Sequence, residues 1–564
     1  MISQTTLLRT IKGGSISLAV AAILFAAFTT QAQSQDAAKD GQPQVLTRGP
    51  IHEAFATPVT FDPKPGASAP RMPPPLVDEL PPDQKPDGDN VAWIPGYYQW
   101  DEERKNFVWI SGFWRVMPPG RKWIPGYWNK QDDNSSQWVS GYWAAAEQAQ
   151  VEYLPAPPPT LETGPQNQAP GPNYIWTPGC YVYRDSHWWW RPGFYVAASP
   201  GWIWMPAYYA YTPCGYVYVD GYWDWSVRRR GVIFAPCYWS AWSYRPVYVY
   251  RPTVCIDVDI VTDHFFCRTG YGCYYFGDYY GGTYVSLGFS PWFKFHYARG
   301  GGYCPVYAYN AWYFRSSNPR WEIELSAGYD YRFRNVDARP PRTYVAQVNI
   351  INKTTVINNT TIVNKTVVAK PITQIAADSA GKKDAPMHFA KIDASQQKQF
   401  KQQGMESQQL VQKRFDMEKQ ASKQLGGNVA AQRNSQSNSQ TTGNRQPLKL
   451  DMPKSPIVAK PADKMGSGAD IQHGDGTKIS SQPPEKPGQG NTTRNASGTG
   501  TSGSGGAPTG GTKLTVPPGD GATKPAGGAS GVSGGSKPTT ATRPAGGSGS
   551  GSSGGSGKPG KVGS

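Results

Sequence analysis

Branched aliphatic side chains are scarce in this 564-residue sequence, whereas Gly (63) and Pro (52) are abundant. Leu, Ile and Val supply most of the interior of an ordinary globular domain, so this composition argues against such a core. In their place the chain carries 21 Trp, 33 Tyr and 19 Phe residues. We therefore expect a core built of aromatic rings, joined by many turns and by segments that are not packed.

Recognised catalytic motifs are also missing. Six histidines are spread along the chain, and none stands in a catalytic pattern with a nearby Cys, Ser or carboxylate. There is no Gly-x-Ser-x-Gly, no His-Glu-x-x-His and no phosphate-binding loop. These absences argue against an enzyme and give no reason to expect a cofactor.

Long apolar runs are absent except near the start. Residues 16–28 form an apolar run behind the basic residues Arg9 and Lys12, and Thr30-Gln31-Ala32 has small residues where signal peptidase reads the chain. A spanning helix needs about 20 apolar residues. Residues 1–32 are therefore predicted to be a signal peptide cleaved near Ala32, and the mature protein to be secreted, periplasmic or at the cell surface.

Seven cysteines fall within one stretch of the chain, and no two form a Cys-x-x-Cys pair. In an oxidising compartment this pattern favours disulfides over a metal site. Spacing leaves the pairing open, including which cysteine stays free. The candidates are Cys180, Cys214, Cys237, Cys255, Cys267, Cys273 and Cys304.

A six-residue unit of aromatic residues and glycine recurs nine times, with starts 14 to 16 residues apart within each of two blocks. The copies start at Trp93, Trp109, Trp123 and Trp138 in the first block and at Trp176, Trp190, Trp204, Tyr218 and Phe234 in the second. Such a period indicates a repeat architecture whose neighbouring units share a core.

Pro-Gly occupies the centre of several copies, namely Pro95-Gly96, Pro125-Gly126, Pro178-Gly179 and Pro192-Gly193. Pro and Gly suit the two central positions of a type II turn, and aromatic runs of strand-like composition flank them. We therefore predict two short antiparallel strands per copy, with turns at Pro-Gly and at the polar connectors. The alternative is one longer strand bulged at Gly, against which a proline in the middle of a ladder argues.

These units resemble the secreted WXXGXW-repeat (YXWGXW-repeat) proteins of bacteria over about residues 90–240. The resemblance implies an exported repeat protein and carries no activity or ligand. Ala207 and Cys237 stand where the family has Gly, which predicts that those two turns are held in another way, for Cys237 by a disulfide.

Composition divides the rest of the chain. Residues 33–89 and 144–172 are Pro-rich and are predicted to be linkers that flank the repeat blocks 90–143 and 173–240. Residues 241–342 are predicted to be a small α+β region. Its helix is expected to begin at Asn318-Pro319, with Trp321, Leu325, Tyr329 and Phe333 on one face.

Residues 343–372 contain three hexads, read as an extended strand or as a stalk through which chains pair into a homo-oligomer; a parallel β-helix is the alternative. Residues 373–425 are predicted to be a linker and a helix that spans 395–425, with Leu410, Met417, Ala421 and Leu425 as its apolar stripe. Residues 426–564 carry 15 Lys or Arg against 6 Asp or Glu among Gly, Ser and Pro, and are predicted to be a disordered basic tail.

One cluster of metal-ligand residue types is present: Asp257, Asp259, Asp263 and His264. On a strand Asp257 and Asp259 point the same way and would offer oxygen ligands to a hard cation. The alternation of Ile256, Val258 and Ile260 explains the same pattern as the solvated face of an amphipathic strand, so we expect no metal site.

The sequence thus predicts a mainly β protein of short antiparallel hairpin repeats, followed by a small α+β region, one C-terminal helix and a long disordered tail. The expected function is that of a secreted or cell-envelope scaffold. A glycan- or cell-wall-binding module that uses exposed Trp and Tyr is the alternative, and a metal-dependent hydrolase at Asp257–His264 is a remote one. The net charge of +16 favours an anionic cell-wall polymer, polysaccharide or membrane surface as partner rather than nucleic acid.

Overall fold

A computed structural model describes residues 42–162, 164–239, 249–268, 271–297, 302–357, 366–424, 447–452 and 454–459, with two short strands at 471–472 and 478–479. The chain divides into two compact units, 1–490 and 491–564, and all described residues belong to the first. The predicted signal peptide, part of the hexad segment and most of the predicted tail lie outside the described residues. Among the described residues, no helix is both long and apolar enough to cross a membrane.

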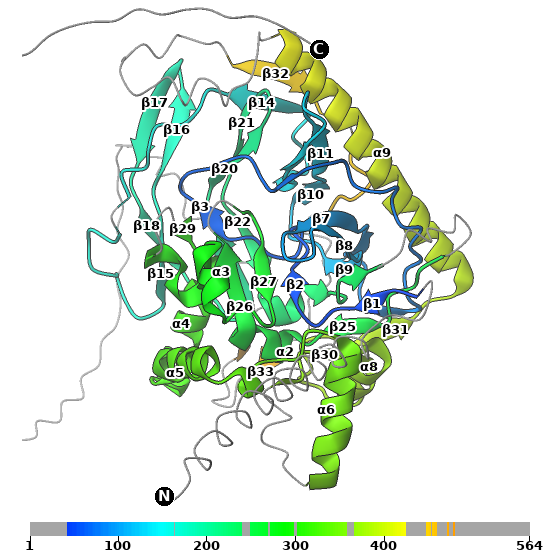
Figure 1. Cartoon of the computed structure of the whole chain (residues 1–564). Coiled ribbons are helices and arrows are strands. Elements are labelled where there is room, and N and C mark those ends of the chain that lie inside the picture. The colour runs from blue at the N-terminus through cyan, green and yellow to red at the C-terminus, as the bar shows by residue number, and fades with distance from the viewer. Residues whose placement is uncertain are drawn as a thin grey trace, which may run out of the picture. The chain divides into compact units, whose positions relative to one another are not determined.

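Eight of the nine copies form four long β-hairpins, each made of two consecutive copies (Figure 1). Hairpin 1 (residues 91–116) contains β6 (Val91–Ile94), β7 (Tyr97–Asp101), β8 (Asn106–Ile110) and β9 (Phe113–Val116). Hairpin 2 (121–145) contains β10 (Arg121–Ile124), β11 (Tyr127–Lys130), β12 (Ser136–Val139) and β13 (Tyr142–Ala145). Hairpin 3 (174–197) contains β15 (Tyr174–Thr177), β16 (Cys180–Arg184), β17 (His187–Arg191) and β18 (Phe194–Ala197). Hairpin 4 (202–225) contains β19 (Trp202–Met205), β20 (Tyr208–Thr212), β21 (Gly215–Val219) and β22 (Tyr222–Trp225).

The Pro-Gly step bends a strand and does not turn the chain back. In hairpin 1 the outer strands pair at Ile94↔Phe113 and the inner strands at Tyr97↔Ile110, in one continuous register without an inserted residue. The polar connector between β7 and β8 is the actual hairpin turn. Antiparallel hairpins are thus confirmed, but the turns predicted at Pro95-Gly96, Pro125-Gly126, Pro178-Gly179 and Pro192-Gly193 are wrong. Proline is tolerated because the ladder is interrupted at the bend, where its missing N–H is not needed.

The bend places the two halves of a hairpin in different sheets. The inner strands of hairpin 1 belong to the sheet β1-β24-β8-β7, and its outer strands to the sheet β23-β9-β6. The inner strands of hairpin 4 continue into β14 and β32. The added strands are β1 (Gln44–Val45), β14 (Gln150–Leu154), β23 (Gly231–Val232), β24 (Cys237–Tyr238) and β32 (Leu448–Asp451).

The ninth copy has no following copy to pair with and adds a strand to hairpin 1 instead. Gly231 pairs with Arg115, and Cys237 pairs with Trp109. The end of the repeat array therefore returns to its beginning. Cys237 is held by a contact between its Sγ and the Tyr250 hydroxyl at 2.8 Å rather than by the predicted disulfide.

The predicted linkers are folded against the hairpins in the part of the chain that the structure describes. Residues 44–89 supply β1 and four more short strands, and Ile51, Ala54 and Phe55 among them are at most 1% exposed. The four strands are β2 (Gly49–Pro50), β3 (Val59–Thr60), β4 (Ser68–Ala69) and β5 (Gln84–Pro86). Segment 144–172 likewise supplies β14. Composition did not predict these strands, because the segments are ordered by packing against the hairpins and have no apolar pattern of their own.

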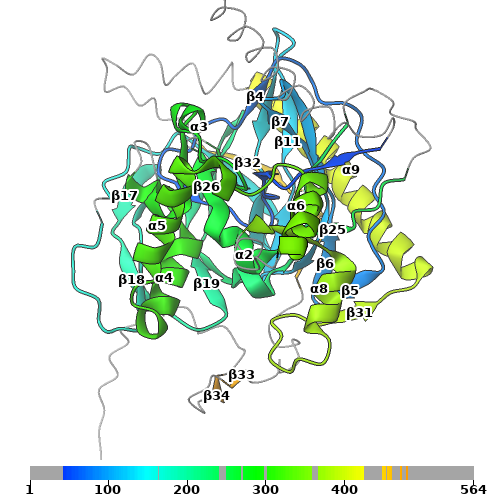
Figure 2. The ribbon, with the colours of Figure 1, turned by 60° about the horizontal axis from the view of Figure 1, so that its bottom comes forward.

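Two helices follow the repeats, α4 (Pro305–Ser317) and α5 (Trp321–Arg334). Figure 2 shows them beside hairpins 3 and 4, where α4 contacts β15 and β19. The helix predicted after Asn318-Pro319 is confirmed as α5. Leu325 and Tyr329 are buried as predicted, but Phe333 is 50% exposed.

The hexad segment differs from its prediction. Residues 344–357 form the helix α6 (Tyr344–Ile357), and only β30 (Ala369–Pro371) is extended. The expected extended strand is therefore wrong for the first hexad, whose aliphatic residues are compatible with helix as well as strand. Pairing of several chains through this segment stays a prediction. The hexads within 358–365 lie outside the described residues.

The predicted C-terminal helix is present as α9 (Ala394–Gln424) and runs along the repeat hairpins, where it contacts β6 and β11 (Figure 1). Leu410 and Ala421 on its predicted stripe are buried. Residues 447–452 and 454–459 of the predicted tail are also folded: β32 pairs with β14, and Ile457 and Ala459 are buried. Two further pieces of the predicted tail, residues 471–472 and 478–479, form paired strands, and the rest of the tail prediction falls on residues that the structure does not describe.

We expect the Gly112→Ala substitution to lower the free energy of unfolding by about 1–3 kcal/mol, the usual cost of overpacking. A Cβ at this position would lie 2.7 Å from Trp93 Cζ2, 2.8 Å from Glu79 Oε2 and 2.8 Å from the Ile94 carbonyl oxygen. Chemical denaturation measures the change. Gly171→Ala is the matched control, because its nearest atoms lie 3.8 Å away. Equal effects of the two substitutions would contradict the bend geometry.

Candidate functional site

Each fixed position of the repeated unit has a structural role at the bend. The first aromatic residue of one copy pairs across the strands with the last aromatic residue of the other copy, as Trp93 does with Trp114 at a ring distance of 5.1 Å. The same Trp93 ring occupies the space where a Cβ at Gly112 would be. The reciprocal contacts join Trp109 to Tyr98 and to Gly96. Glycine is thus required because the indole of the opposite strand crosses it.

Ala207, one departure from the unit, coincides with a smaller ring on the opposite strand. In the other hairpins the crossing residue at this position is Trp109, Trp138 or Trp190, whereas hairpin 4 has Tyr218 there. A phenol ring extends less far sideways than an indole. The shorter ring accounts for the tolerance of a methyl group at Ala207.

Two buried glutamates from the segment before the repeats bind the bends. Glu79 accepts hydrogen bonds from Trp109 Nε1 (3.1 Å) and from the Gly112 N–H (2.7 Å). Glu53 makes the same pair of contacts in hairpin 2, with Trp138 Nε1 (3.1 Å) and the Gly141 N–H (2.9 Å). Each carboxylate therefore satisfies an N–H group that the interrupted ladder leaves unpaired. In hairpin 3, Glu162 accepts from the N–H of its bend glycine at 2.6 Å.

Burial raises the pKa of Glu53 and of Glu79 to about 7, and the surrounding N–H donors oppose the rise. Burial disfavours the charged carboxylate, whereas hydrogen bonds to its oxygens favour it. Both glutamates therefore titrate near neutral pH while holding a bend.

The carbonyl groups at the bend of hairpin 2 are held by a cationic side chain. In hairpin 2, Arg414 Nη1 of α9 donates to the carbonyl oxygens of Pro125 (2.7 Å) and Ser140 (3.1 Å). Arg414 also pairs with Glu418, which accepts hydrogen bonds from the hydroxyls of Tyr127 in hairpin 2 and Tyr153 in β14. The C-terminal helix is thus fastened to a bend through a buried ion pair.

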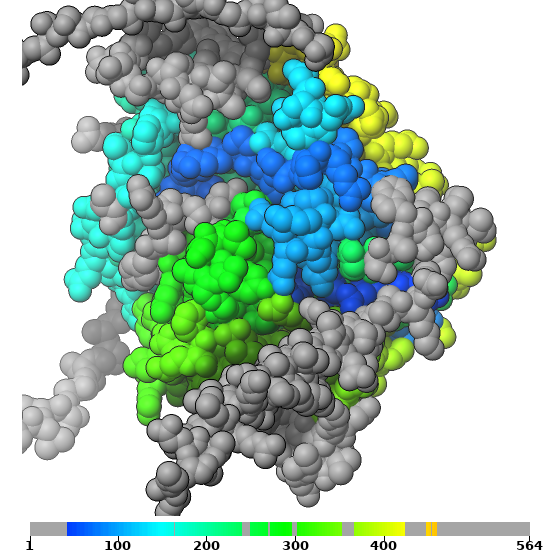
Figure 3. All heavy atoms as spheres, viewed as in Figure 1, coloured from blue at the N-terminus to red at the C-terminus, as the bar shows by residue number. Residues whose placement is uncertain are grey.

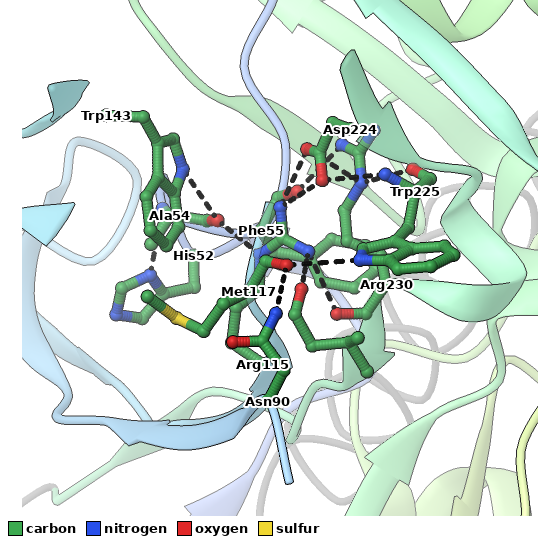
Figure 4. Close-up of polar contacts among 11 residues, drawn as sticks. His52, Ala54, Phe55, Asn90, Arg115, Met117, Trp143, Asp224, Trp225 and Arg230 are labelled. Carbon is green, nitrogen blue, oxygen red and sulfur yellow. Dashed lines mark hydrogen bonds and ion pairs between the residues drawn. The ribbon is translucent and has the colours of Figure 1, made fainter. Parts of the chain in front are cut away.

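A second buried ion cluster joins hairpin 1 to hairpin 4 (Figure 4). Arg115 of β9 donates through Nη2 to both carboxylate oxygens of Asp224 in β22 at 2.7 Å, and Arg230 Nε lies 3.2 Å from Asp224 Oδ2. Arg115 also donates to the Ala54 carbonyl, and Arg230 to the Phe55 carbonyl. Burial lowers the pKa of Arg115 to about 10, so it stays charged at neutral pH. The cluster holds the first and last hairpins and the segment before them together.

Hairpin 3 is the exception to ring burial. The register places Val182 opposite Trp189 and Arg184 opposite His187, so these four side chains share one face of the β16–β17 pair. Trp189 is 61% exposed, and Arg184 and His187 are exposed as well. The atoms of this hairpin, cyan in Figure 3, lie on the surface. The opposite face packs on hairpin 4, where the Trp188 and Tyr209 ring centres are 5.7 Å apart.

A hollow of about 510 Å³ lies along the exposed face, lined by residues that include Val182, Arg184, Trp189 and Arg191. A two-residue turn, Asp185-Ser186, closes the hairpin with positive φ at both residues, as a type I′ turn requires. The exposed indole is thus presented on a rigid hairpin, and this face is the candidate binding site. A pattern of repeats could not single it out, because all copies look alike in sequence.

The predicted metal candidates do not come together. Residues 258–261 form α2 (Val258–Val261) instead of a strand. Asp257 pairs with Lys370 at 2.7 Å, and Asp259 pairs with Arg228 at 2.5 Å. His264 is buried, with Nδ1 2.8 Å from the Tyr280 hydroxyl, and Asp263 contributes its carbonyl to neighbouring side chains. Among the described residues, no group of three or more His, Cys, Asp or Glu side chains could hold a metal ion.

All seven cysteines are thiols in the structure, and six of them are buried. The predicted disulfides are therefore not confirmed. Cys267 of β26 (Phe265–Arg268) and Cys304, which precedes α4, are in side-chain hydrogen-bond contact. The Tyr274 hydroxyl lies 3.0 Å from Cys304 Sγ.

A family model of two WXXGXW copies matches the chain four times, at residues 88–115, 123–144, 171–193 and 200–224. These matches coincide with the four hairpins, so the two-copy unit of the family corresponds to one bent hairpin. Comparison with curated proteins and with solved structures returns no match.

The free energy of unfolding should fall as pH rises from about 4.5 to above 7. Over this range the folded protein retains protons on Glu53 and Glu79 that the unfolded chain has released. Because the pKa of each glutamate is higher in the folded protein than in the unfolded chain, each adds to the free energy of unfolding. This contribution is complete below the pKa of the unfolded chain and is lost as the pH rises through the pKa of the folded protein. Each pKa unit corresponds to about 1.4 kcal/mol per group.

Glu79→Gln keeps the shape of the side chain but does not titrate, so we expect it to reduce the pH dependence. Denaturant unfolding of wild type and variant at several pH values between 4.5 and 8 measures this slope. The exposed Glu147→Gln is the control and should keep the wild-type slope. An unchanged slope in Glu79→Gln would show that Glu79 does not titrate in this range.

Proposed function

The chain belongs to the WXXGXW-repeat family, and from this premise we propose that it is an exported, non-catalytic scaffold of the cell envelope. The observation that carries the proposal is that the buried charged side chains are engaged in contacts within the fold. Glu53, Glu79, Arg115, Asp224 and Arg414 bind main-chain groups or one another across hairpins. Such a body supplies a rigid platform between the segments at its two ends.

The sequence of residues 1–32 supports export. The basic residues of 426–564 support a location in the cell envelope. An anionic surface attracts a chain with spaced lysines, and the attraction weakens with salt. A membrane surface, a cell-wall polymer or a polysaccharide each supplies such charge.

A second candidate function is glycan binding, and the exposed face of hairpin 3 favours it. An indole face stacks on apolar C–H patches of a sugar ring, while polar neighbours hydrogen-bond its hydroxyl groups. Rings in hairpins 1, 2 and 4 are mostly buried, so glycan binding by the repeats would centre on hairpin 3.

Purified exported protein should begin at Gln33 and should contain a Cys267–Cys304 disulfide. The two side chains are already in contact, and an oxidising compartment converts such pairs to disulfides. N-terminal sequencing and mass spectrometry of non-reduced peptides test both statements. Cys255 serves as the internal control: it is as buried as Cys267, but its thiol contacts no other cysteine of the described residues and should remain a thiol. Free thiols at both Cys267 and Cys304 would contradict the pairing.

Deletion of residues 460–564 should reduce retention of the protein on isolated cell envelopes at low salt. The deletion begins after Ala459 so that β32 and the buried residues near it are kept. Retention of the full mature chain should decrease at about 1 M salt, where the Debye length falls to about 3 Å. Sedimentation with envelopes measures both effects. Retention that responds neither to the deletion nor to salt would contradict an electrostatic tether, and no retention at all would contradict the envelope role.

A further inference from the structure

We propose that the exposed face of hairpin 3 binds an acidic polysaccharide, with a sugar ring stacked on Trp189 and a carboxylate group paired with Arg184. This assignment rests on the proposed glycan-binding function and names its site and ligand class. Trp189 is 61% exposed at the centre of the face. Among the described residues of the four hairpins, it is the one large hydrophobic side chain that is exposed.

Two arginines flank Trp189 along the hairpin. Arg191 follows two residues later on the same strand. Arg184 lies on the opposite strand, two pairs closer to the turn than Val182, which is the partner of Trp189. With a rise of about 3.3–3.4 Å per residue, the line Arg184–Trp189–Arg191 spans roughly 13–14 Å. That length accommodates several sugar units and suits a polymer rather than a monosaccharide.

The charge of the face selects an acidic ligand. Arg184 makes no ion pair with the described residues. Arg191 donates to Cys180 Sγ at 3.2 Å and is attracted by the carboxylate of Asp220, so Arg184 carries the charge that is available to a ligand. Asp185 is the one carboxylate among the residues that line the hollow. A guanidinium binds a carboxylate through two parallel, charge-assisted hydrogen bonds, whereas a neutral glycan offers no negative charge.

The hairpin is preorganised to present this face. Its other face is anchored by the Trp188–Tyr209 ring contact and by a hydrogen bond of 2.8 Å from the Tyr209 hydroxyl to the Tyr181 carbonyl. The Asp185-Ser186 turn keeps the two strands in register. Binding therefore requires little ordering of the protein.

Affinity electrophoresis of the full mature chain tests the proposal with polygalacturonate, its methyl-esterified neutral form and a neutral glucan as probes. We expect binding to polygalacturonate that weakens with salt and is reduced about tenfold by Trp189→Ala, the fold-change of one aromatic contact of about 1.4 kcal/mol. Arg184→Gln should reduce affinity for polygalacturonate while leaving binding to the neutral probes unchanged. Tyr331→Ala is the control, since it removes a ring that is 57% exposed on α5, outside the repeats.

The outcomes separate the inference from the function on which it rests. If the protein binds polygalacturonate but Trp189→Ala and Arg184→Gln bind as wild type does, the site assignment is wrong and glycan binding lies elsewhere. Equal binding of the acidic and neutral probes would overturn the ligand class. Absence of binding to all three probes would overturn the proposed glycan binding by this face as well.

Discussion

The structure depends on one constraint: at the bend of each hairpin the β-ladder is interrupted, and this bend lies inside the protein. Buried N–H and carbonyl groups need partners, and the bend itself cannot supply them. Glu79 and Glu53 provide acceptors for N–H groups at the bends of hairpins 1 and 2, and Arg414 provides donors for carbonyl groups at the bend of hairpin 2. These side chains come from the segments before and after the repeats. The repeat array is therefore completed by residues that lie outside it in sequence.

The same constraint explains the composition of the repeated unit. A bend allows both halves of a hairpin to face inward, and cross-strand ring pairs such as Trp93–Trp114 then fill the interior in place of aliphatic side chains. Edge-to-face contacts suit this arrangement, because ring edges meet ring faces at about 5 Å. Glycine follows from the crossing indole and not from a positive φ, since neither Gly96 nor Gly112 lies in the left-handed region.

Sequence reasoning succeeded where the signal was local and periodic. The strands of the repeats, α5 and α9 follow from aromatic runs and from spacing of apolar residues. It failed where order comes from distant partners. Pro95-Gly96 reads as a turn because a turn and a bend share the same local preferences, and only pairing across the hairpin separates them. Segment 33–89 reads as a linker because its buried glutamates acquire their partners only in the folded hairpins.

Hairpin 3 is less enclosed by the rest of the protein than the other three hairpins. Each of the other three hairpins has at least one half extended by further strands, whereas among the described residues both halves of hairpin 3 remain two-stranded. Its bend is bound by Glu162, which is only partly buried, in place of the fully enclosed Glu53 or Glu79. A hairpin with fewer neighbours leaves one face in solvent, and the residues of that face need not serve the core. Hairpins 1, 2 and 4 thus form the stable core of the array, and hairpin 3 has a surface that is open to solvent.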